Sequence, residues 1–337
     1  MQYKSSRKTL YFCLDPRWIL SIAVATLLAS CSAPTWVKPP SRALPAQPQL
    51  AENSYTSFDG DSLGYRKWLP SKKEPKTVII GIHGISGYSG DYKNLAKFLL
   101  KNNPDTAMYA AETRGQGMDP KLCRRGDICH VDDWYKDLHT FTGLVRKVHP
   151  KAQIVWFGES MGSLIAMHSY VHTPPGAQKP DAMIISSPIV DVNERLQPWK
   201  YTMVRTTSLL FPTLKVSLES LSGGQSVVVT EDDIHQDQVL KNEWYIKQYT
   251  LRLLLNLGNM SASLSRPAST VACPVLVLHG GKDIFTSDSS VRTFYAGFPG
   301  GTDKNIKIYP GSYHLLMYDH ERDKIFADIS KWLHQLK

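Results

Sequence analysis

From about residue 55 onward the chain alternates short β-type runs with helical patterns, and no other feature of the sequence restricts its fold as strongly. The run "TVIIGIHG" at 77–84 is apolar throughout, as a strand buried on both faces is. The stretch "DYKNLAKFLLKN" directly after "YSG" has apolar residues at helical spacing. Alternation on this scale predicts an α/β fold with a mostly parallel central sheet and helices on both faces.

The same alternation continues along the chain. Further strands are expected within 106–115, 153–160, 182–188, 273–283 and 305–314. Further helices are expected within 132–150, 161–172, 289–298 and 321–336. Because parallel strands end at one edge of a sheet, catalytic side chains should lie at the carboxyl ends of these strands.

One insertion interrupts this rhythm. Residues 189–267 contain no clear strand but carry two apolar helical stretches, "WKYTMVRTTSLLFPTLKV" and "EWYIKQYTLRLLLNLGNM". These stretches need covering, and they fall between two core strands, so we interpret the insertion as a helical cap over the site. The alternative is that the helices pack on the core as structure alone.

The pentapeptide Gly-Glu-Ser-Met-Gly at 158–162 joins a strand directly to a helix, with Ser160 at the turn. So sharp a turn forces strained backbone angles on the serine and exposes its hydroxyl. Gly158 and Gly162 lack the side chains that would clash with neighbouring backbone. The pattern therefore indicates a nucleophile, although Gly-x-Ser-x-Gly alone is a weak signal.

A serine needs a base and an orienting acid to act as a nucleophile at neutral pH. Asp283 follows the run "VLVLHGGK", and His314 follows "NIKIYPGSY", so both stand just beyond predicted strands. The order Ser160, Asp283, His314 is the order expected of an α/β-hydrolase. Asp288 and His320 are the competing acid and base.

The motif "HGIS" at 83–86 follows the strand that ends at Ile82, where an oxyanion loop is expected. The backbone N–H groups of Ile85 and Met161 are the predicted donors to a developing oxyanion. We interpret His83 as a residue that shapes this loop, and not as a second base.

With these residues in place, the chain from about 55 to 337 resembles the monoacylglycerol lipase and lysophospholipase group of serine α/β-hydrolases. The similarity is carried by "HGISGYSGDYKNLAKFL", "GESMGSLIA", "SSPIVDV", "VLVLHGGKDIFTSDSS" and "KIYPGSYHLL". The resemblance implies the triad Ser160, Asp283 and His314, the oxyanion donors Ile85 and Met161, and a cap that acts as a lid over an acyl pocket.

The chain departs from that group at several positions. Glu159 stands where the group commonly has a histidine before the nucleophile, and Ser163 replaces a glycine. The turn "GQGMD" at 115–119 lacks the group's histidine and serine, and the loop "CRRGDIC" at 123–129 is unlike its usual pattern. These departures leave the triad chemistry intact but bear on the substrate.

The first thirty residues have the features of a bacterial lipoprotein signal. A basic stretch precedes the apolar run "WILSIAVATLLAS", and Leu28-Ala29-Ser30-Cys31 resembles a lipobox, which makes Cys31 the predicted lipidation site. A proline-rich segment follows and is expected to be an extended tether. We therefore expect a periplasm-facing, lipid-anchored protein of the bacterial cell envelope, in the outer membrane because Ser32 is not the aspartate that retains many lipoproteins in the inner membrane.

Cys123 and Cys129 flank the short stretch "RRGDI", and an oxidising periplasm favours a disulfide between them, with two free thiols as the alternative. No histidine–cysteine spacing suggests zinc, and the chemistry proposed needs no metal or cofactor. The net charge is +9, and the first thirty residues carry four basic side chains against one acidic, which leaves +6 for the rest. No basic block or stripe occurs downstream, so a nucleic-acid partner is not expected.

The chain is expected to divide into a signal peptide at 1–30, a linker at 31–54, a core at 55–188, a cap at 189–267 and the rest of the core at 268–337. The expected function is hydrolysis of carboxylic esters of single-acyl lipids, monoacylglycerols or lysophospholipids, through an acyl-enzyme. The alternatives are a thioesterase, an aminopeptidase that holds its substrate's amine with Glu231, Asp232 or Asp233, and an inactive hydrolase fold that serves as an envelope binding lipoprotein.

Overall fold

The computed structural model describes residues 46–71, 74–190, 198–217, 228–231, 241–242 and 244–336. The predicted signal peptide, the lipidation site Cys31 and most of the predicted linker lie outside the described residues. In the part of the chain that is described, no helix is both long and apolar enough to cross a membrane.

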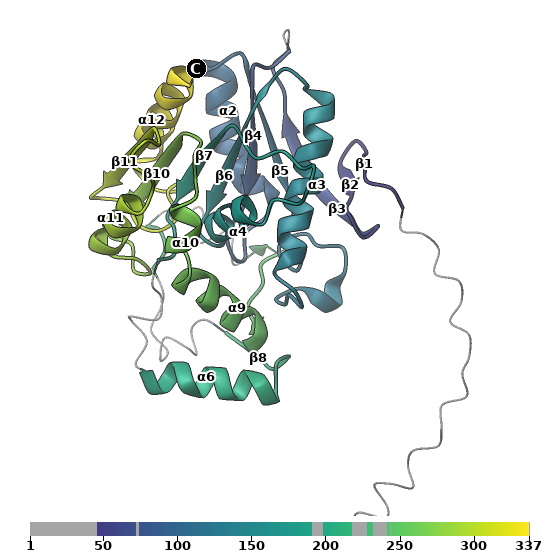
Figure 1. Cartoon of the computed structure of the whole chain (residues 1–337), viewed down its shortest axis with the longest axis vertical. Helices are drawn as coiled ribbons and strands as arrows, with labels where there is room; N and C mark the ends of the chain where they lie inside the picture. The colour runs from purple at the N-terminus through teal and green to yellow at the C-terminus, as the bar shows by residue number, and fades with distance from the viewer. Residues whose placement is uncertain are drawn as a thin grey trace, which may run out of the picture. The chain divides into compact units, whose positions relative to one another are not determined.

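A nine-stranded sheet forms the centre of the described chain, in the order β1-β2-β3-β5-β4-β6-β7-β10-β11 (Figure 1). Neighbours from β1 to β5 pair antiparallel, and all pairs from β5 to β11 are parallel. The strands are β1 (Gln49–Leu50), β2 (Ser54–Thr56), β3 (Ser62–Trp68), β4 (Thr77–Ile82), β5 (Thr106–Ala111), β6 (Gln153–Glu159), β7 (Ala182–Ser186), β10 (Val275–Gly280) and β11 (Lys304–Tyr309).

Helices cover both faces of this sheet. One apolar core lies between the sheet and α3, α4, α9, α10 and α11, and a second lies between the sheet and α2 and α12. The helices are η1 (Ser89–Tyr92), α2 (Lys93–Asn102), η2 (Leu122–Arg124), α3 (Asp132–Val148), α4 (Met161–Val171), α6 (Pro198–Leu210), α9 (Leu251–Ala262), α10 (Ser265–Ala268), α11 (Asp288–Ala296) and α12 (Arg322–Gln335). The strands and helices expected in the core after residue 76 all occur, within a few residues of their expected bounds, whereas in the insertion the second helical stretch begins only at Leu251.

Local sequence explains where these elements begin and end. Helix α3 has Asp132 and Asp133 in its first turn and Arg146 and Lys147 in its last, which complements the helix dipole, and Pro150 follows it. Helix α4 is buried along almost its whole length, because it packs between the sheet, α3, α9 and α10.

Two features were not expected from the sequence. β1 lies inside the stretch assigned to the linker, because Gln49 and Leu50 pair with β2 and extend the sheet at its edge. The insertion 189–267 contains a two-stranded ladder, β8 (Lys215–Val216) and β9 (Tyr249–Thr250), beside its helices. Strands of two residues leave no detectable alternation in a sequence.

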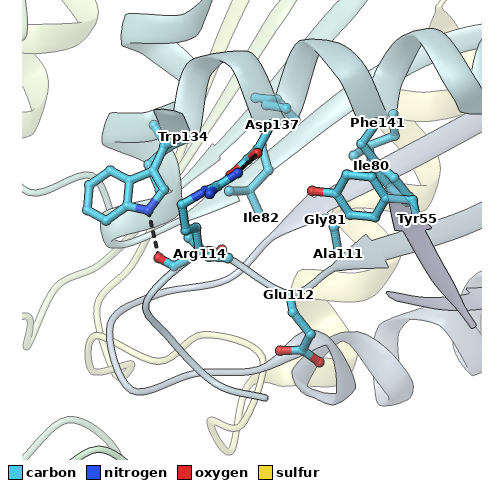
Figure 2. Close-up of a pocket in the computed structure, with 13 residues that line it drawn as sticks. Tyr55, Ile80, Gly81, Ile82, Ala111, Glu112, Arg114, Trp134, Asp137 and Phe141 are labelled. Carbon is cyan, nitrogen blue, oxygen red and sulfur yellow. Dashed lines mark hydrogen bonds and ion pairs between the residues drawn. The ribbon is translucent and has the colours of Figure 1, made fainter. Parts of the chain in front are cut away.

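A small cavity of about 30 Å³ lies between β4, β5 and α3 (Figure 2). Arg114 lines it and pairs through two nitrogens with Asp137 on α3, at 2.7 and 2.8 Å, while the indole N–H of Trp134 donates to the Arg114 carbonyl at 2.8 Å. The volume suits a water molecule or two and is far too small for an acyl chain.

Candidate active site

Ser160 lies between the end of β6 and the start of α4, at the carboxyl edge of the parallel sheet. Its backbone has φ 55° and ψ −117°, a strained conformation for a residue with a side chain. Its N–H donates to the Ser186 carbonyl on β7 at 3.0 Å, and this bond fixes the turn to the sheet. The side chain thus stands at the N-terminus of a helix, where negative charge is favoured.

The glycines on either side allow this turn to close. A Cβ atom added to Gly158 would lie 2.4 Å from the Gly162 carbonyl oxygen, and one added to Gly162 would lie 1.8 Å from the Ile82 carbonyl oxygen. Neither contact is tolerable, so strand β6, helix α4 and the end of β4 approach this closely only with glycine at both positions.

His314 and Asp283 meet Ser160 from two neighbouring strand ends. His314 Nε2 is 2.8 Å from Ser160 Oγ, and His314 Nδ1 is 2.8 Å from Asp283 Oδ2. All three side chains are buried, at 8 % exposure or less. The structure therefore brings together the three residues singled out in the sequence, with the spacing of a nucleophile, a base and an orienting acid.

Burial raises the pKa of Asp283, but the charge and hydrogen bond of His314 and the N–H of Phe285 outweigh it, so the pKa lies below its ordinary value. Asp283 Oδ1 accepts the Phe285 N–H at 2.7 Å, and the Phe285 ring packs edge-on against the His314 ring at 4.6 Å. The carboxylate is thus ionised and fixed at neutral pH.

The competing residues lie elsewhere. Asp288 is half exposed, and its carboxylate is 3.4 Å from Nε2 of His279. His320 is exposed at the surface before α12. Ser160 contacts His314 and His314 contacts Asp283, whereas Asp288 reaches Asp283 only through His279, whose Nδ1 is 3.8 Å from Asp283 Oδ2.

The loop after β4 passes directly beside the nucleophile. A Cβ added to Gly84 would lie 3.1 Å from the Cβ of Ser160 and 3.7 Å from its Oγ, so the residue before Ile85 closely approaches the nucleophile. Met161 is the first residue of α4, so its N–H has no partner inside the helix. The loop that carries Ile85 and the first residue of α4 thus both lie next to Ser160, and the role of their N–H groups as oxyanion donors stays a prediction.

His83 is fully buried in this loop and has a structural contact on each nitrogen. Its Nε2 accepts the Thr113 N–H at 3.0 Å, so Nδ1 carries the proton and donates to the Gly84 carbonyl at 2.9 Å. Because the carbonyl of Gly84 and the N–H of Ile85 belong to one trans peptide, anchoring the first directs the second the opposite way. This arrangement agrees with a loop-shaping histidine.

Backbone strain marks this edge of the sheet. In the described part of the chain, the non-glycine residues with positive φ are all serines: Ser86 (61°), Ser160 (55°) and Ser187 (45°). Ser187 follows β7 and donates its hydroxyl to the His314 carbonyl at 2.6 Å. Strained residues persist where their surroundings hold them, and they gather at functional sites. Sequence reasoning missed Ser86 and Ser187, because a serine in a loop carries no local signal of its backbone angles.

Glu159, which stands where the resembling group commonly has a histidine, directly precedes the nucleophile and is buried. It is 2 % exposed, and its Oε1 has no hydrogen-bond partner. Burial raises its pKa to about 8, the charge of Asp91 adds to this, and a bond from the Met317 backbone opposes it. The raised pKa favours the protonated acid at neutral pH, and the carboxyl lies beside the Met317 backbone.

The other departures also make contacts near the site. The Ser163 hydroxyl donates to the Ser160 carbonyl at 2.5 Å and closes the first turn of α4. Gln116 in the "GQGMD" turn is buried, and its side-chain oxygen accepts the Ser86 N–H at 3.3 Å. The turn thus contacts the oxyanion loop through Gln116.

The expected disulfide between Cys123 and Cys129 is not formed; both residues are exposed free cysteines. Other contacts close this loop. The Gly126 N–H donates to the Gly115 carbonyl at 2.8 Å, and Arg124 pairs with Asp119. Cys123 lies in η2, and Cys129 contacts Arg252, so the two thiols face different surroundings.

Among the described residues, no group of three or more histidine, cysteine, aspartate and glutamate side chains forms an arrangement that could hold a metal ion. Of the acids considered for an aminopeptidase, Glu231 accepts a hydrogen bond from the Tyr313 hydroxyl at 2.5 Å. Asp232 and Asp233 lie outside the described residues.

Comparison with known proteins agrees with this geometry. Residues 73–321 match the family described as "Serine aminopeptidase, S33". The chain is 24 % identical over 286 residues to the monoacylglycerol lipase of Mycolicibacterium smegmatis, covering 84 % of this chain and 96 % of that protein. It is 26 % identical over 285 residues to human monoglyceride lipase, covering 82 % and 88 %.

A solved structure of a soluble variant of Saccharomyces cerevisiae monoglyceride lipase, in complex with a substrate analog, is similar in fold. Its TM-score is 0.70 at 16 % identity, and the alignment covers 88 % of this chain and 97 % of that one. This similarity confirms the predicted α/β-hydrolase fold, and the family match covers well over half of the chain. The chain therefore belongs to this serine aminopeptidase family of α/β-hydrolases, and it is similar to monoacylglycerol lipases.

Proposed function

We propose that the protein is a serine hydrolase that cleaves carboxylic esters of single-acyl lipids, of the monoacylglycerol or lysophospholipid type. The observation that carries the proposal is the continuous contact from Asp283 through His314 to Ser160, with both distances at 2.8 Å. The relatives named monoacylglycerol and monoglyceride lipase support the ester and the single acyl chain.

The proposed reaction proceeds in two acyl transfers. Ser160 Oγ attacks the ester carbonyl while His314 Nε2 takes its proton, and Asp283 stabilises the resulting imidazolium. The N–H groups of Ile85 and Met161 bind the oxyanion. His314 then returns the proton to the leaving alcohol. In the second transfer, water attacks the acyl-enzyme while His314 takes its proton, and His314 returns this proton to Ser160 Oγ as the acid leaves.

Exposed apolar side chains on the cap are further evidence for a lipid substrate at a membrane. Helix α6 and the turn after it expose large apolar side chains: Met203 (53 %), Leu209 (74 %), Leu210 (69 %), Phe211 (61 %) and Leu214 (48 %). We call these five residues the α6 apolar patch. A patch of this kind fits a bilayer surface, which agrees with a lipidated Cys31 and a place in the bacterial envelope.

Ser160→Ala and a fluorophosphonate probe test this proposal directly. We expect the probe to label the wild-type protein and not the variant, because only an activated serine reacts with it. A panel of glycerol esters, lysolipids, thioesters and aminoacyl amides then assigns the substrate class, with single-acyl esters expected to be hydrolysed fastest. Folded protein that no probe labels would instead favour a binding lipoprotein.

A further inference from the structure

The loop "CRRGDIC" at 123–129 joins the core to the cap. The Gly126 carbonyl accepts the Thr250 N–H at 2.9 Å, and Asp127 Oδ1 accepts the Thr250 hydroxyl at 2.6 Å. Asp127 also pairs with Arg252, with Nε at 3.1 Å from Oδ1. Burial raises the pKa of Asp127, but its bonds from Arg252 and Thr250 lower it below its ordinary value, so the pair is ionic at neutral pH. We call residues 244–252 the return segment of the cap.

The return segment reaches the oxyanion loop through one side chain. Tyr249, 1 % exposed, immediately precedes Thr250, and its hydroxyl bonds with the Ser86 hydroxyl. Both hydroxyls also lie within hydrogen-bond distance of the Ile246 carbonyl, at 2.6 Å for Tyr249 and 3.2 Å for Ser86. The contact thus joins residues that are 163 positions apart.

Ser86 needs such support, because its backbone conformation is unfavourable for a residue with a side chain. It is the third residue of a four-residue turn that closes with the Gly87 N–H on the Gly84 carbonyl at 3.1 Å. Its φ of 61° has the sign that a type II turn requires at this position, which usually holds glycine. Ile85 is the second residue of the same turn, so the position of its N–H depends on this turn.

We propose that Tyr249 is a positioning residue that holds the Ile85 N–H in place through Ser86, and that Asp127 keeps Tyr249 there through Thr250 and Arg252. The cap then helps to support the oxyanion hole, and the hole has its full geometry only when this contact with the cap is made. This inference rests on the proposed ester hydrolysis. It adds that the loop at 123–129 influences the reaction through the return segment, without being part of the active site itself.

Tyr249→Phe removes the hydroxyl and keeps the ring in its packed position. We expect kcat on a soluble single-acyl ester to fall about ten- to thirtyfold, because a displaced oxyanion donor acts only in the transition state. KM should stay within about twofold. Affinity for an alkyl boronic acid, which mimics the tetrahedral intermediate, should fall in parallel with kcat/KM.

Tyr295→Phe is the matched control, because the Tyr295 hydroxyl also donates to a backbone carbonyl, that of Lys304 at 2.9 Å, but far along the chain in α11. It should leave kcat within twofold. Thermal unfolding of all variants in the full-length chain in detergent checks that they fold. A kcat loss in Tyr249→Phe with a wild-type Tm and boronate affinity reduced to match supports positioning.

A double-mutant cycle with Ser86→Ala tests the connection. If both hydroxyls act through one bond, the double variant should lose no more activity than the worse single variant. Asp127→Asn breaks the ion pair with Arg252 but keeps an oxygen for Thr250, so we expect a smaller kcat loss, about threefold to tenfold, again without a rise in KM.

The inference would be overturned by an unchanged kcat in Tyr249→Phe, or by losses in Tyr249→Phe and Ser86→Ala that multiply in the double variant. A rise in KM alone would also overturn it, because that marks a substrate contact. If the wild-type protein neither reacts with fluorophosphonate nor cleaves any ester, the proposed function is wrong. Failure of the proposed function can therefore be distinguished from failure of the positioning inference.

Discussion

Glu159 shows how one side chain beside a nucleophile can make stability depend on pH. A glutamate that is buried without a cation keeps its proton, and here nothing but the Met317 backbone favours its charged form. The groups around it are Asp91, Tyr92 and Tyr318, whose own pKa values are raised by burial. Ionising Glu159 would therefore add a negative charge to a pocket that already holds acids.

The unfolded chain releases the Glu159 proton near the ordinary glutamate pKa, while the folded chain holds it up to about pH 8. Between these values the unfolded state binds fewer protons, so stability falls as pH rises, by at most about 1.4 kcal/mol per pH unit. We expect Glu159→Gln to lack this slope. Urea unfolding of both proteins at pH 5, 6.5 and 8 measures it.

Glu52→Gln, at an exposed position, serves as the control and should follow the wild-type curve. Parallel pH–stability curves for wild type and Glu159→Gln would show that the carboxyl is ionised in the folded state, contrary to this account.

Among the described helices, α6 differs in that several of its large apolar side chains are exposed. It packs against α9 (Figure 1), and the exposed side chains of the α6 apolar patch lie on α6 and in the turn that follows it. A helix in a soluble protein buries its apolar stripe on a neighbour, and one that leaves large apolar residues in solvent gains by binding an apolar surface.

Replacing Leu209, Leu210 and Phe211 together with serine should weaken binding to phospholipid vesicles. Each lost apolar side chain contributes on the order of 1 kcal/mol or more, so we expect at least a tenfold loss of vesicle binding. Turnover of a soluble short-chain ester should stay near wild type, because the triad is untouched. Vesicle co-sedimentation of a chain that starts at Ser32 measures the patch without the lipid anchor, and equal binding by both proteins would contradict the assignment.

At the scale of the whole molecule, Arg114 holds distant parts of the chain together. It pairs with Asp59 and Asp61 in the turn between β2 and β3, and with Asp137 on α3. The guanidinium is 5 % exposed, and its bonds to these carboxylates outweigh burial and raise its pKa. Removing it would leave Asp137 buried without a cation.

Arg114→Met should therefore lower the free energy of unfolding by about 3–5 kcal/mol, as breaking one partner of a buried pair does. The comparison is Arg146→Met, which breaks a pair with the half-exposed Asp181 and should cost less than about 1 kcal/mol. Urea unfolding at pH 7 measures both. A similar small loss in the two variants would mean that solvent screens the Arg114 network.

The order of strands and helices could be predicted because each element has a local pattern. The apolar run of β4 and the helical spacing of α3 need only their own residues to be recognised. The positions of Ser160, Asp283 and His314 followed from the same patterns, since parallel strands end at one edge of the sheet. The two-residue strands β1, β8 and β9 could not be found this way, because they are too short for alternation.

The periodic elements, their alternation and the strand ends at which reactive side chains stand can thus be predicted from local sequence patterns. Contacts between distant segments depend on the packing of the folded chain: Ser86 bonds with Tyr249 of the return segment, Arg114 pairs with three acids, Glu159 is buried, and Cys123 and Cys129 are not joined in a disulfide. The reason is physical. Periodicity reports only which face of an element is apolar, whereas contacts between distant loops depend on how whole elements pack, and a polar residue in a loop carries no local record of its partner.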